Sequence, residues 1–133
     1  MPASEAAIGE GRAGTKRHYG FSTVTMRREV AHDGIGEIGT VRVESSGDGL
    51  EFIDLTSIPP GATVGIHRHA LDNEEIYVII SGEGEMTVEQ ETFPVGPGDV
   101  IVNDPGGEHG LRNVGAQELR MVVVQRRLAK PGR

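Results

Sequence analysis

Short runs in which apolar and polar residues alternate make up most of the chain, and glycine or proline residues separate these runs. An alternation of period two puts every second side chain on the same face of an extended strand. No stretch combines the 3.6-residue period of an amphipathic helix with capping residues at its ends. The pattern therefore predicts an all-β fold of about nine short strands, as in a jelly roll or barrel.

The expected strands lie between turn signals such as Pro-Pro-Gly and Gly-Pro-Gly-Asp. The run at 75–81 is the most apolar, the run at 119–126 closes the fold, and an early stretch at 22–30 has only modest β-propensity. The other expected strands are 40–43, 50–57, the stretch after Gly61 that carries two histidines, 85–89, 92–95, 100–103 and 108–112.

The length of 133 residues fits one domain with short extensions at its ends. Residues 1–19 are rich in alanine, glycine and charge without any periodicity, so we expect a flexible N-terminal arm. Residues 20–128 are then a single β-barrel domain, and residues 129–133 form a C-terminal tail.

The composition of the chain limits which partners it can bind and which side chains can hold a metal. The formal net charge of −7 argues against nucleic acid and anionic membranes, because both attract concentrated positive charge. An apolar run of membrane-spanning length and a secretory leader pattern are both missing from the sequence, so we expect a soluble, cytoplasmic protein. The chain has no cysteine, which excludes disulfides and thiolate ligands. Any bound metal must therefore be held by nitrogen and oxygen.

Three histidines and a glutamate form a candidate metal site. His67 and His69 project from the same face of one strand, Glu75 opens the next strand, and His109 follows a Pro-Gly-Gly turn. Each residue alone is more simply interpreted as a solvated surface residue. Together they predict a site for one divalent transition metal, namely Fe, Mn, Ni, Cu or Zn. Six-coordinate binding leaves two positions for water or substrate, whereas a closed tetrahedral zinc site leaves none.

Two motifs in the chain resemble those of the cupin superfamily. The first reads Gly61-x5-His67-x-His69…Glu75-x6-Gly82, and the second reads Gly98…Pro105-x-Gly107…His109-x3-Asn113. The resemblance implies a double-stranded β-helix, that is, a jelly-roll cupin barrel. It also implies that the four metal ligands are His67, His69, Glu75 and His109.

The chain departs from the family pattern in two places. Family members usually have three or four residues between the second histidine and the glutamate; Glu74 satisfies four, whereas Glu75 requires five. Counted back from Gly82, however, Glu75 keeps the six-residue spacing, and a loop absorbs an insertion more easily than a strand. We therefore expect Glu75 as the ligand and Glu74 facing outward. In the second motif, Gly98 and Pro105 are one residue further apart than usual, and the following glycine-to-histidine spacing is one shorter.

Residues that share the ligands' faces should line a pocket beside the metal. Tyr77 is the most informative of them, because its hydroxyl can orient a substrate or a metal-bound water, which would make it a catalytic residue. A core tyrosine with a satisfied hydroxyl is the alternative interpretation. The expected lining residues are Thr63, Gly65, Tyr77, Ile79 and Leu111.

Other side chains near the motifs suggest partners. Arg112 and Arg120 are candidates for binding a substrate carboxylate, although solvated surface arginines are commoner. Arg68 should point away from the site. Val64 and Ile66 lie on the face of their strand opposite the histidines and need covering, which suggests a homodimer.

The resemblance implies a metal-dependent enzyme acting on a small oxygenated or carboxylated metabolite. Oxygenase, decarboxylase, isomerase and cyclase reactions all occur on this fold, and no residue identifies a general base. The alternative is a non-catalytic module that binds a metal or a metabolite. A ligand-sensing role is a weaker alternative, since no helical DNA-binding segment accompanies the barrel.

Overall fold

The computed structural model describes residues 17–44 and 49–128. Most of the arm predicted at 1–19 and all of the tail predicted at 129–133 lie outside these residues. The described part contains ten strands and no helix long and apolar enough to cross a membrane. The strands are β1 (Arg27–Glu29), β2 (Ile38–Val43), β3 (Leu50–Ile58), β4 (Thr63–Arg68), β5 (Asn73–Ser81), β6 (Gly84–Val88), β7 (Glu91–Val95), β8 (Val100–Asn103), β9 (Glu108–Asn113) and β10 (Leu119–Arg127).

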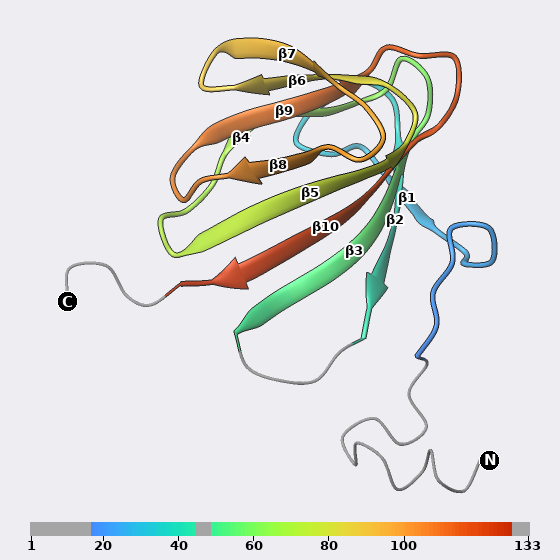
Figure 1. Ribbon diagram of the computed structural model, residues 1–133, viewed down its shortest axis with the longest axis horizontal. Helices are drawn as coiled ribbons and strands as arrows, with labels where there is room; N and C mark the ends of the chain where they lie inside the picture. The colour runs from blue at the N-terminus through green and yellow to red at the C-terminus, as the bar shows by residue number, and fades with distance from the viewer. Residues whose placement is uncertain (1–16, 45–48, 129–133) are drawn as a thin grey trace, which may run out of the picture.

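Two antiparallel sheets face each other as two layers (Figure 1). The larger sheet has the order β1-β2-β3-β10-β5-β8, and the smaller sheet has the order β4-β9-β6-β7. Strands that follow each other in the chain often lie in different sheets, as β4 and β5 do. This arrangement confirms the predicted all-β jelly roll.

The core lies between the sheets and comes from alternate positions of their strands. On β5, Tyr77 and Ile79 are 2% and 1% exposed, and on β10 Met121 is 1% exposed. Leu111 of β9, in the smaller sheet, is buried in the same core and faces inward, as predicted. The alternation that marked these strands in the sequence is therefore the alternation between the core and the outer faces.

The early strand predicted at 22–30 is only partly correct. Residues 20–24 form a turn, in which the amides of Thr23 and Val24 both donate to the carbonyl of Gly20. Only Arg27–Glu29 pairs as a strand, and it pairs with β2 alone at the edge of the sheet. Only three residues of this stretch, which has modest β-propensity, therefore form a strand.

A β-bulge interrupts the first histidine strand. Val64 pairs with Leu111 and His67 pairs with His109, so three steps along β4 match two steps along β9. The extra residue restarts the alternation, because a bulge moves the following side chains to the other face. Val64 is consequently buried in the core and Ile66 is 58% exposed. The prediction that Thr63 and Gly65 share the inner face with His67 is wrong for this reason.

Candidate metal centre

The structure brings the four predicted residues together. His67 lies near the end of β4, His69 directly after that strand, Glu75 on β5 and His109 on β9. Their ligand atoms all lie within 4.8 Å of one another. Glu75 Oε1 is 3.1 Å from His109 Nε2 and 3.2 Å from His69 Nε2. The cluster thus joins the two sheets, because Glu75 comes from the larger sheet and His67 and His109 from the smaller one.

Hydrogen bonds on the far side of two rings decide which nitrogens face the centre. His67 Nδ1 lies 2.7 Å from the carbonyl oxygen of Gly65, which only accepts, so this nitrogen is the donor. His69 Nδ1 likewise donates to the side-chain oxygen of Asn73 at 2.9 Å. When both rings are neutral, both Nε2 atoms therefore carry lone pairs, and they face each other at 3.2 Å. Such partners on the outer nitrogen are typical of metal-binding histidines.

Burial and charge put Glu75 and His67 in the protonation state that binds a cation. Burial has the largest effect on Glu75 and raises its pKa, but the hydrogen bonds from His109 and His69 and the charges of both rings outweigh it and lower the pKa to about 2. Burial lowers the pKa of His67 to about 4. The hydrogen bond to Glu75 raises the pKa of His69. At neutral pH Glu75 is anionic and His67 is neutral, as metal ligation requires.

The neighbouring charged residues point away from the cluster, as predicted. Glu74 forms an ion pair with Arg126 at 2.7 Å instead of joining the histidines. Arg68 donates to the carbonyl of Gly106 at 2.5 Å and lies 3.6 Å from Glu89. The spacing counted back from Gly82, which follows β5, therefore identified Glu75 as the glutamate that reaches the cluster.

The two arginines considered for a substrate carboxylate lie elsewhere. Arg112 pairs with Glu85 at 3.1 Å on the outer face of the smaller sheet. The guanidinium of Arg120 lies 5.7 Å from the ring centre of Phe21, on the outer face of the larger sheet. Because both side chains leave their strands on the side opposite the core, neither fits that role.

Tyr77 and Asn103 line the cluster from the larger sheet. The Tyr77 ring meets the His109 ring edge-on, with centroids 5.6 Å apart. Burial, followed by the charge of Glu75 and a hydrogen bond to it, raises the pKa of the Tyr77 hydroxyl well above its ordinary value. Asn103 pairs with Glu75 across β5 and β8 and is 2% exposed, yet neither polar atom of its amide has a partner within the described part of the chain.

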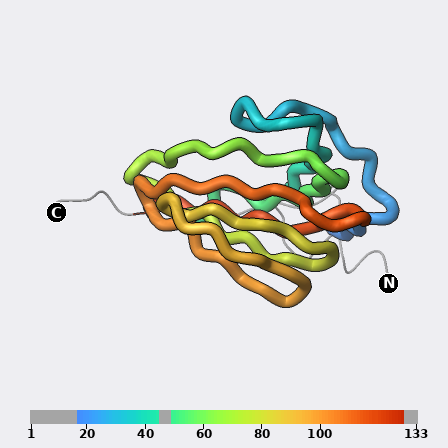
Figure 2. Tube along the Cα trace, turned by 90° about the horizontal axis from the view of Figure 1, so that it is seen from above, coloured from blue at the N-terminus to red at the C-terminus, as the bar shows by residue number. Residues whose placement is uncertain are grey.

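His32 lies in a turn, and its ring stacks on that of His67. The centroids are 3.5 Å apart and the planes differ by 6°. Ala31 forms a bridge with Val64, so the turn that carries His32 lies alongside β4 (Figure 2). A Cβ atom on Gly65 would meet the carbonyl oxygen of His32 at 2.1 Å, so the contact requires glycine at that position. No periodic signal marked this residue, because it belongs to a turn.

A cavity of about 220 Å³ opens beside the cluster on the inner face of the larger sheet. Its wall near the cluster contains His32, His67, Glu75 and Tyr77. Its remaining lining mixes apolar and polar residues, namely Glu29, Ala31, Ile38, Thr40, Arg42, Phe52, Asp54, Thr56, Val64, Met121 and Val123. A space of this size accepts a small metabolite.

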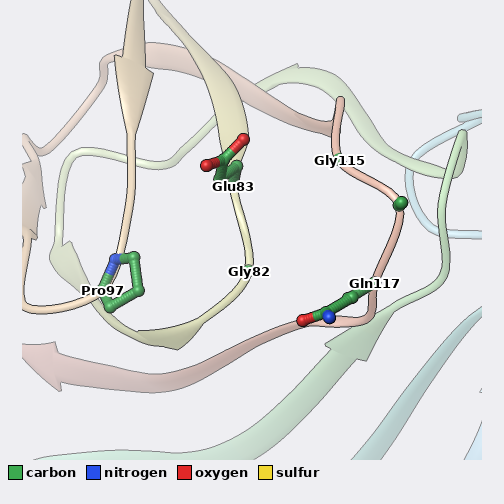
Figure 3. A pocket seen from close by; sticks show the side chains of 6 residues that line it. Gly82, Glu83, Pro97, Gly115 and Gln117 are labelled. Atoms are coloured by element: carbon green, nitrogen blue, oxygen red, sulfur yellow. The ribbon is translucent and has the colours of Figure 1, made fainter.

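A larger hollow of about 420 Å³ lies among turns at the other end of β5 from Glu75 (Figure 3). Gly82, Glu83, Pro97, Gly115, Ala116 and Gln117 line it. Glu83 is the one titratable side chain among these six residues. The hollow therefore offers little chemistry, and the cluster remains the candidate site.

The residues fit a divalent transition metal. Ligand atoms at right angles around an ion, each about 2.1 Å from it, lie about 3.0 Å apart. The contacts of Glu75 with His69 and His109, and of His67 with His69, are 3.1–3.2 Å. A cation would also relieve the repulsion between the two facing lone pairs of His67 and His69. The unpartnered amide of Asn103 next to Glu75 indicates that a further polar group belongs there.

Comparison with known proteins gives the same picture. Residues 54–125 match the family model described as Cupin domain. The oxalate-binding protein of Thermotoga maritima is 37% identical over 67 residues, which are 50% of this chain and 54% of that protein. L-ectoine synthase of Vibrio campbellii is 33% identical over 87 residues, 64% of this chain and 66% of that protein. The 5-nitrosalicylic acid 1,2-dioxygenase of a Bradyrhizobium species is 31% identical over 84 residues, 61% of this chain and 40% of that protein.

Solved structures share the fold. A crystal structure from Thermotoga maritima, described as a predicted oxalate decarboxylase, matches with a TM-score of 0.78 and 28% identity, over 84% of this chain and 100% of that one. The cupin domain of Cnp3 from Schizosaccharomyces pombe matches with a TM-score of 0.70 at 16% identity, which shows the fold alone. The chain spans about half of the length of the oxalate-binding protein. The family match covers more than half of the chain and includes both histidine-bearing motifs completely, so this chain belongs to the cupin domain family.

Proposed function

We propose that the protein is a metal-dependent cupin enzyme that acts on a small oxygenated or carboxylated metabolite. The observation that carries the proposal is the convergence of three imidazoles and one carboxylate, within 4.8 Å, beside a cavity. His67, His69, Glu75 and His109 would hold one divalent ion, which supplies Lewis-acid chemistry when bound. One anionic and three neutral ligands would leave the centre with a net positive charge, which favours an anionic or chelating substrate.

The cavity itself supports a substrate with an acidic or oxygen-rich group. Arg42 lines it, and its guanidinium is fixed twice: an ion pair with Asp54 holds one edge and the ring of Phe52 lies 4.2 Å from its carbon. A guanidinium fixed in this way binds a carboxylate at low entropic cost. We therefore assign the binding of a substrate carboxylate to Arg42 in place of Arg112 and Arg120.

Tyr77 and Asn103 are the polar groups placed to act next to the ligands. The Tyr77 hydroxyl stays protonated at neutral pH because its pKa is raised, so it donates a hydrogen bond and does not act as a base. The Asn103 amide has both a donor and an acceptor to offer. We assign both to orienting substrate or water. The relatives are named for different activities, so they do not select one reaction.

The first experiment measures metal content by elemental analysis together with ligand variants. The purified chain should carry close to one equivalent of a first-row divalent metal. Glu75→Gln should lower the affinity of the protein for the metal by more than about a hundredfold, because it removes a ligand. The loss of a group that only hydrogen-bonds to a ligand costs at most about a hundredfold. Glu74→Gln is the matched control and should bind metal normally, since it loses only an exposed ion pair worth about 0–1 kcal/mol. Metal loss in Glu74→Gln but not in Glu75→Gln would contradict the site.

A non-catalytic binding module is the second candidate, because one relative is named for binding oxalate. Calorimetric titration of the metal-loaded protein with small mono- and dicarboxylates, followed by product analysis, separates the two functions. Binding with no consumption of any carboxylate, with and without dioxygen, would favour the binding module. Turnover that disappears in Glu75→Gln would favour the enzyme.

A further inference from the structure

Two places in the cavity beside the metal cluster can hold an anionic group of a ligand. One is the cluster itself, to which Glu75 and the histidines belong, and the other is the guanidinium of Arg42. Arg42 is the one lysine or arginine in the described lining of the cavity, whereas Glu29 and Asp54 in the same lining are acidic. Anywhere else along the wall, an anion would meet carboxylates or uncharged side chains.

The strand registers give the distance between these two places. Glu75 of β5 lies opposite Gln125 of β10, and Gln125 lies opposite Phe52 of β3. Neighbouring strands are about 4.8 Å apart, so Glu75 and Phe52 are separated by two steps, or about 10 Å. The guanidinium carbon of Arg42 lies 4.2 Å from the centre of the Phe52 ring, and both Phe52 and Glu75 line the cavity from the inner face of the sheet. The cluster and the guanidinium are therefore on the order of 10 Å apart.

Asp54 orients the guanidinium without using all of its donors. Nε and Nη2 of Arg42 donate to the two carboxylate oxygens of Asp54, the second bond being 3.2 Å long. Among the described residues no other side chain accepts from this guanidinium, so Nη1 keeps both of its hydrogens and Nη2 keeps one. The edge between these two nitrogens can bind a second carboxylate through two parallel hydrogen bonds.

The wall between the two places is apolar. β10 lies between β5 and β3 in the larger sheet, and the residues that it contributes to the lining are Met121 and Val123. Both side chains are buried and belong to the hydrophobic core. A ligand that extends from the cluster to Arg42 crosses these side chains, so burial of methylene carbons in its middle is favourable.

We propose that the substrate is a dicarboxylate of about four to six carbons, which binds the metal with one carboxylate and Arg42 with the other. This proposal rests on the proposed function, because the first carboxylate needs the metal site. A coordination bond of about 2.1 Å and a hydrogen bond of about 2.9 Å leave about 5 Å of the span between the oxygens of the two ends. Each carbon–carbon bond advances an extended chain by about 1.25 Å, so three to five bonds span about 4–6 Å. Oxalate has one such bond and is too short to reach both places.

The test is a calorimetric titration of the full chain loaded with Zn²⁺, which has no redox chemistry of its own. The ligands are the unbranched dicarboxylates of two to eight carbons, each compared with the monocarboxylate of the same number of carbons. From four to six carbons, the dicarboxylate should bind about 10–100-fold more tightly than its monocarboxylate, because it gains a charge-assisted pair with Arg42. Arg42→Met should abolish this gain and leave the affinity of the monocarboxylates unchanged. Oxalate, held by the metal alone, should bind Arg42→Met as it binds the unaltered protein.

Arg112→Met is the matched control, because Arg112 is also a strand arginine paired with one carboxylate, that of Glu85, but lies on the outer face of the smaller sheet. It should leave every affinity unchanged. Arg42→Met leaves Asp54 without its partner, so the double variant Arg42→Met with Asp54→Leu provides the same comparison if the single variant does not fold.

Two results would overturn the proposal, and they separate it from the proposed function. If carboxylates bind but the gain is the same in Arg42→Met, or is absent at four to six carbons, the substrate class is wrong and the metal site still stands. If no carboxylate of any length binds the Zn²⁺-loaded protein, the proposed function fails together with this inference.

Discussion

Replacing Gly65 with alanine tests the close contact between β4 and the turn that carries His32. The new Cβ atom would lie 2.1 Å from the carbonyl oxygen of His32 and 3.0 Å from the amide nitrogen of Gly34. Both neighbours are backbone atoms, so no side-chain rotation relieves the overlap. The turn must move away from β4 or the bulge must rearrange.

The structure gives the size of the movement and its cost. Cβ atoms are essentially never found closer than 3.0 Å to such a neighbour, so the turn has to move by about 0.9 Å, the difference between 3.0 and 2.1 Å. Overpacking of this kind costs about 1–3 kcal/mol of unfolding free energy. The same movement separates the His32 ring from the His67 ring, now 3.5 Å apart. We expect metal affinity to fall about 10–100-fold, as when other contacts that orient ligands are lost.

Urea denaturation measures the loss of unfolding free energy in Gly65→Ala, and competition with a chelator measures its loss of metal affinity. Gly96→Ala is the matched control, because a Cβ atom at Gly96 meets nothing within 4 Å; it should change stability by less than about 0.5 kcal/mol. His32→Asn removes the ring but tolerates the left-handed backbone at φ 53°. It should reproduce the loss of metal affinity with a smaller loss of stability.

Two results would refute this reasoning. If Gly65→Ala is as stable as Gly96→Ala, the turn does not approach β4 as closely as described. If Gly65→Ala is destabilised but both it and His32→Asn bind metal normally, the stacked ring does not orient His67.

Three further predictions concern buried polar groups. In the metal-free protein, the lowered pKa values of His67 (about 4, from 6.5) and Glu75 (about 2, from 4.5) mean that the unfolded chain binds protons first. As the pH is lowered, the unfolding free energy should therefore fall between pH 6.5 and 4 because of His67, and again below 4.5 because of Glu75. His69, with its raised pKa, contributes stability below pH 6.5 that is lost at higher pH. An unfolding free energy that does not change in acid would contradict this prediction. Asn103→Leu should stabilise the metal-free protein by about 1 kcal/mol or more in urea denaturation, because it removes an unpartnered amide, yet weaken binding of metal or carboxylate in calorimetry. Asn113→Asp should cost about 3 kcal/mol or more by the same denaturation, because the Asn113 amide donates to two carbonyls at 2.7 Å; an unchanged midpoint would show that these bonds contribute little.

The sequence predicted the strands well where alternation and turns agreed. The strand expected at 100–103 is β8 without change, and the one expected at 75–81 is β5 with two more residues at its start. Glycine and proline flank β8 on both sides and glycine follows β5, and such local signals do not depend on the rest of the fold. The histidines and the glutamate were found for the same reason, since each lies at or near the end of a strand.

The features that the sequence did not reveal depend on contacts between distant segments. The bulge in β4 exists because two residues of that strand pass Gly110 of β9 while the turn around His32 packs alongside. No local pattern encodes either neighbour. The apolar outer face of the larger sheet had a visible signal, namely the continuous apolar runs of β5 and β10, which are typical of strands covered on both faces. Val64 and Ile66 suggested a partner on the smaller sheet because the bulge had not been foreseen.

The apolar character of both faces of β5 raises the question of what fixes its register. A shift by one residue would exchange Tyr77 and Ile79 for Ile76 and Val78, so burial alone distinguishes the two registers weakly. The same shift would replace Glu75 by Glu74 at the metal cluster. Gly82 fixes the correct register from the far end of the strand: its φ of 87° favours glycine, and a Cβ atom there would lie 2.6 Å from the backbone of β10's preceding turn. A rigid turn at the end of the strand therefore determines which glutamate faces the histidines, which is why spacing from that glycine predicted the position better than spacing across the loop.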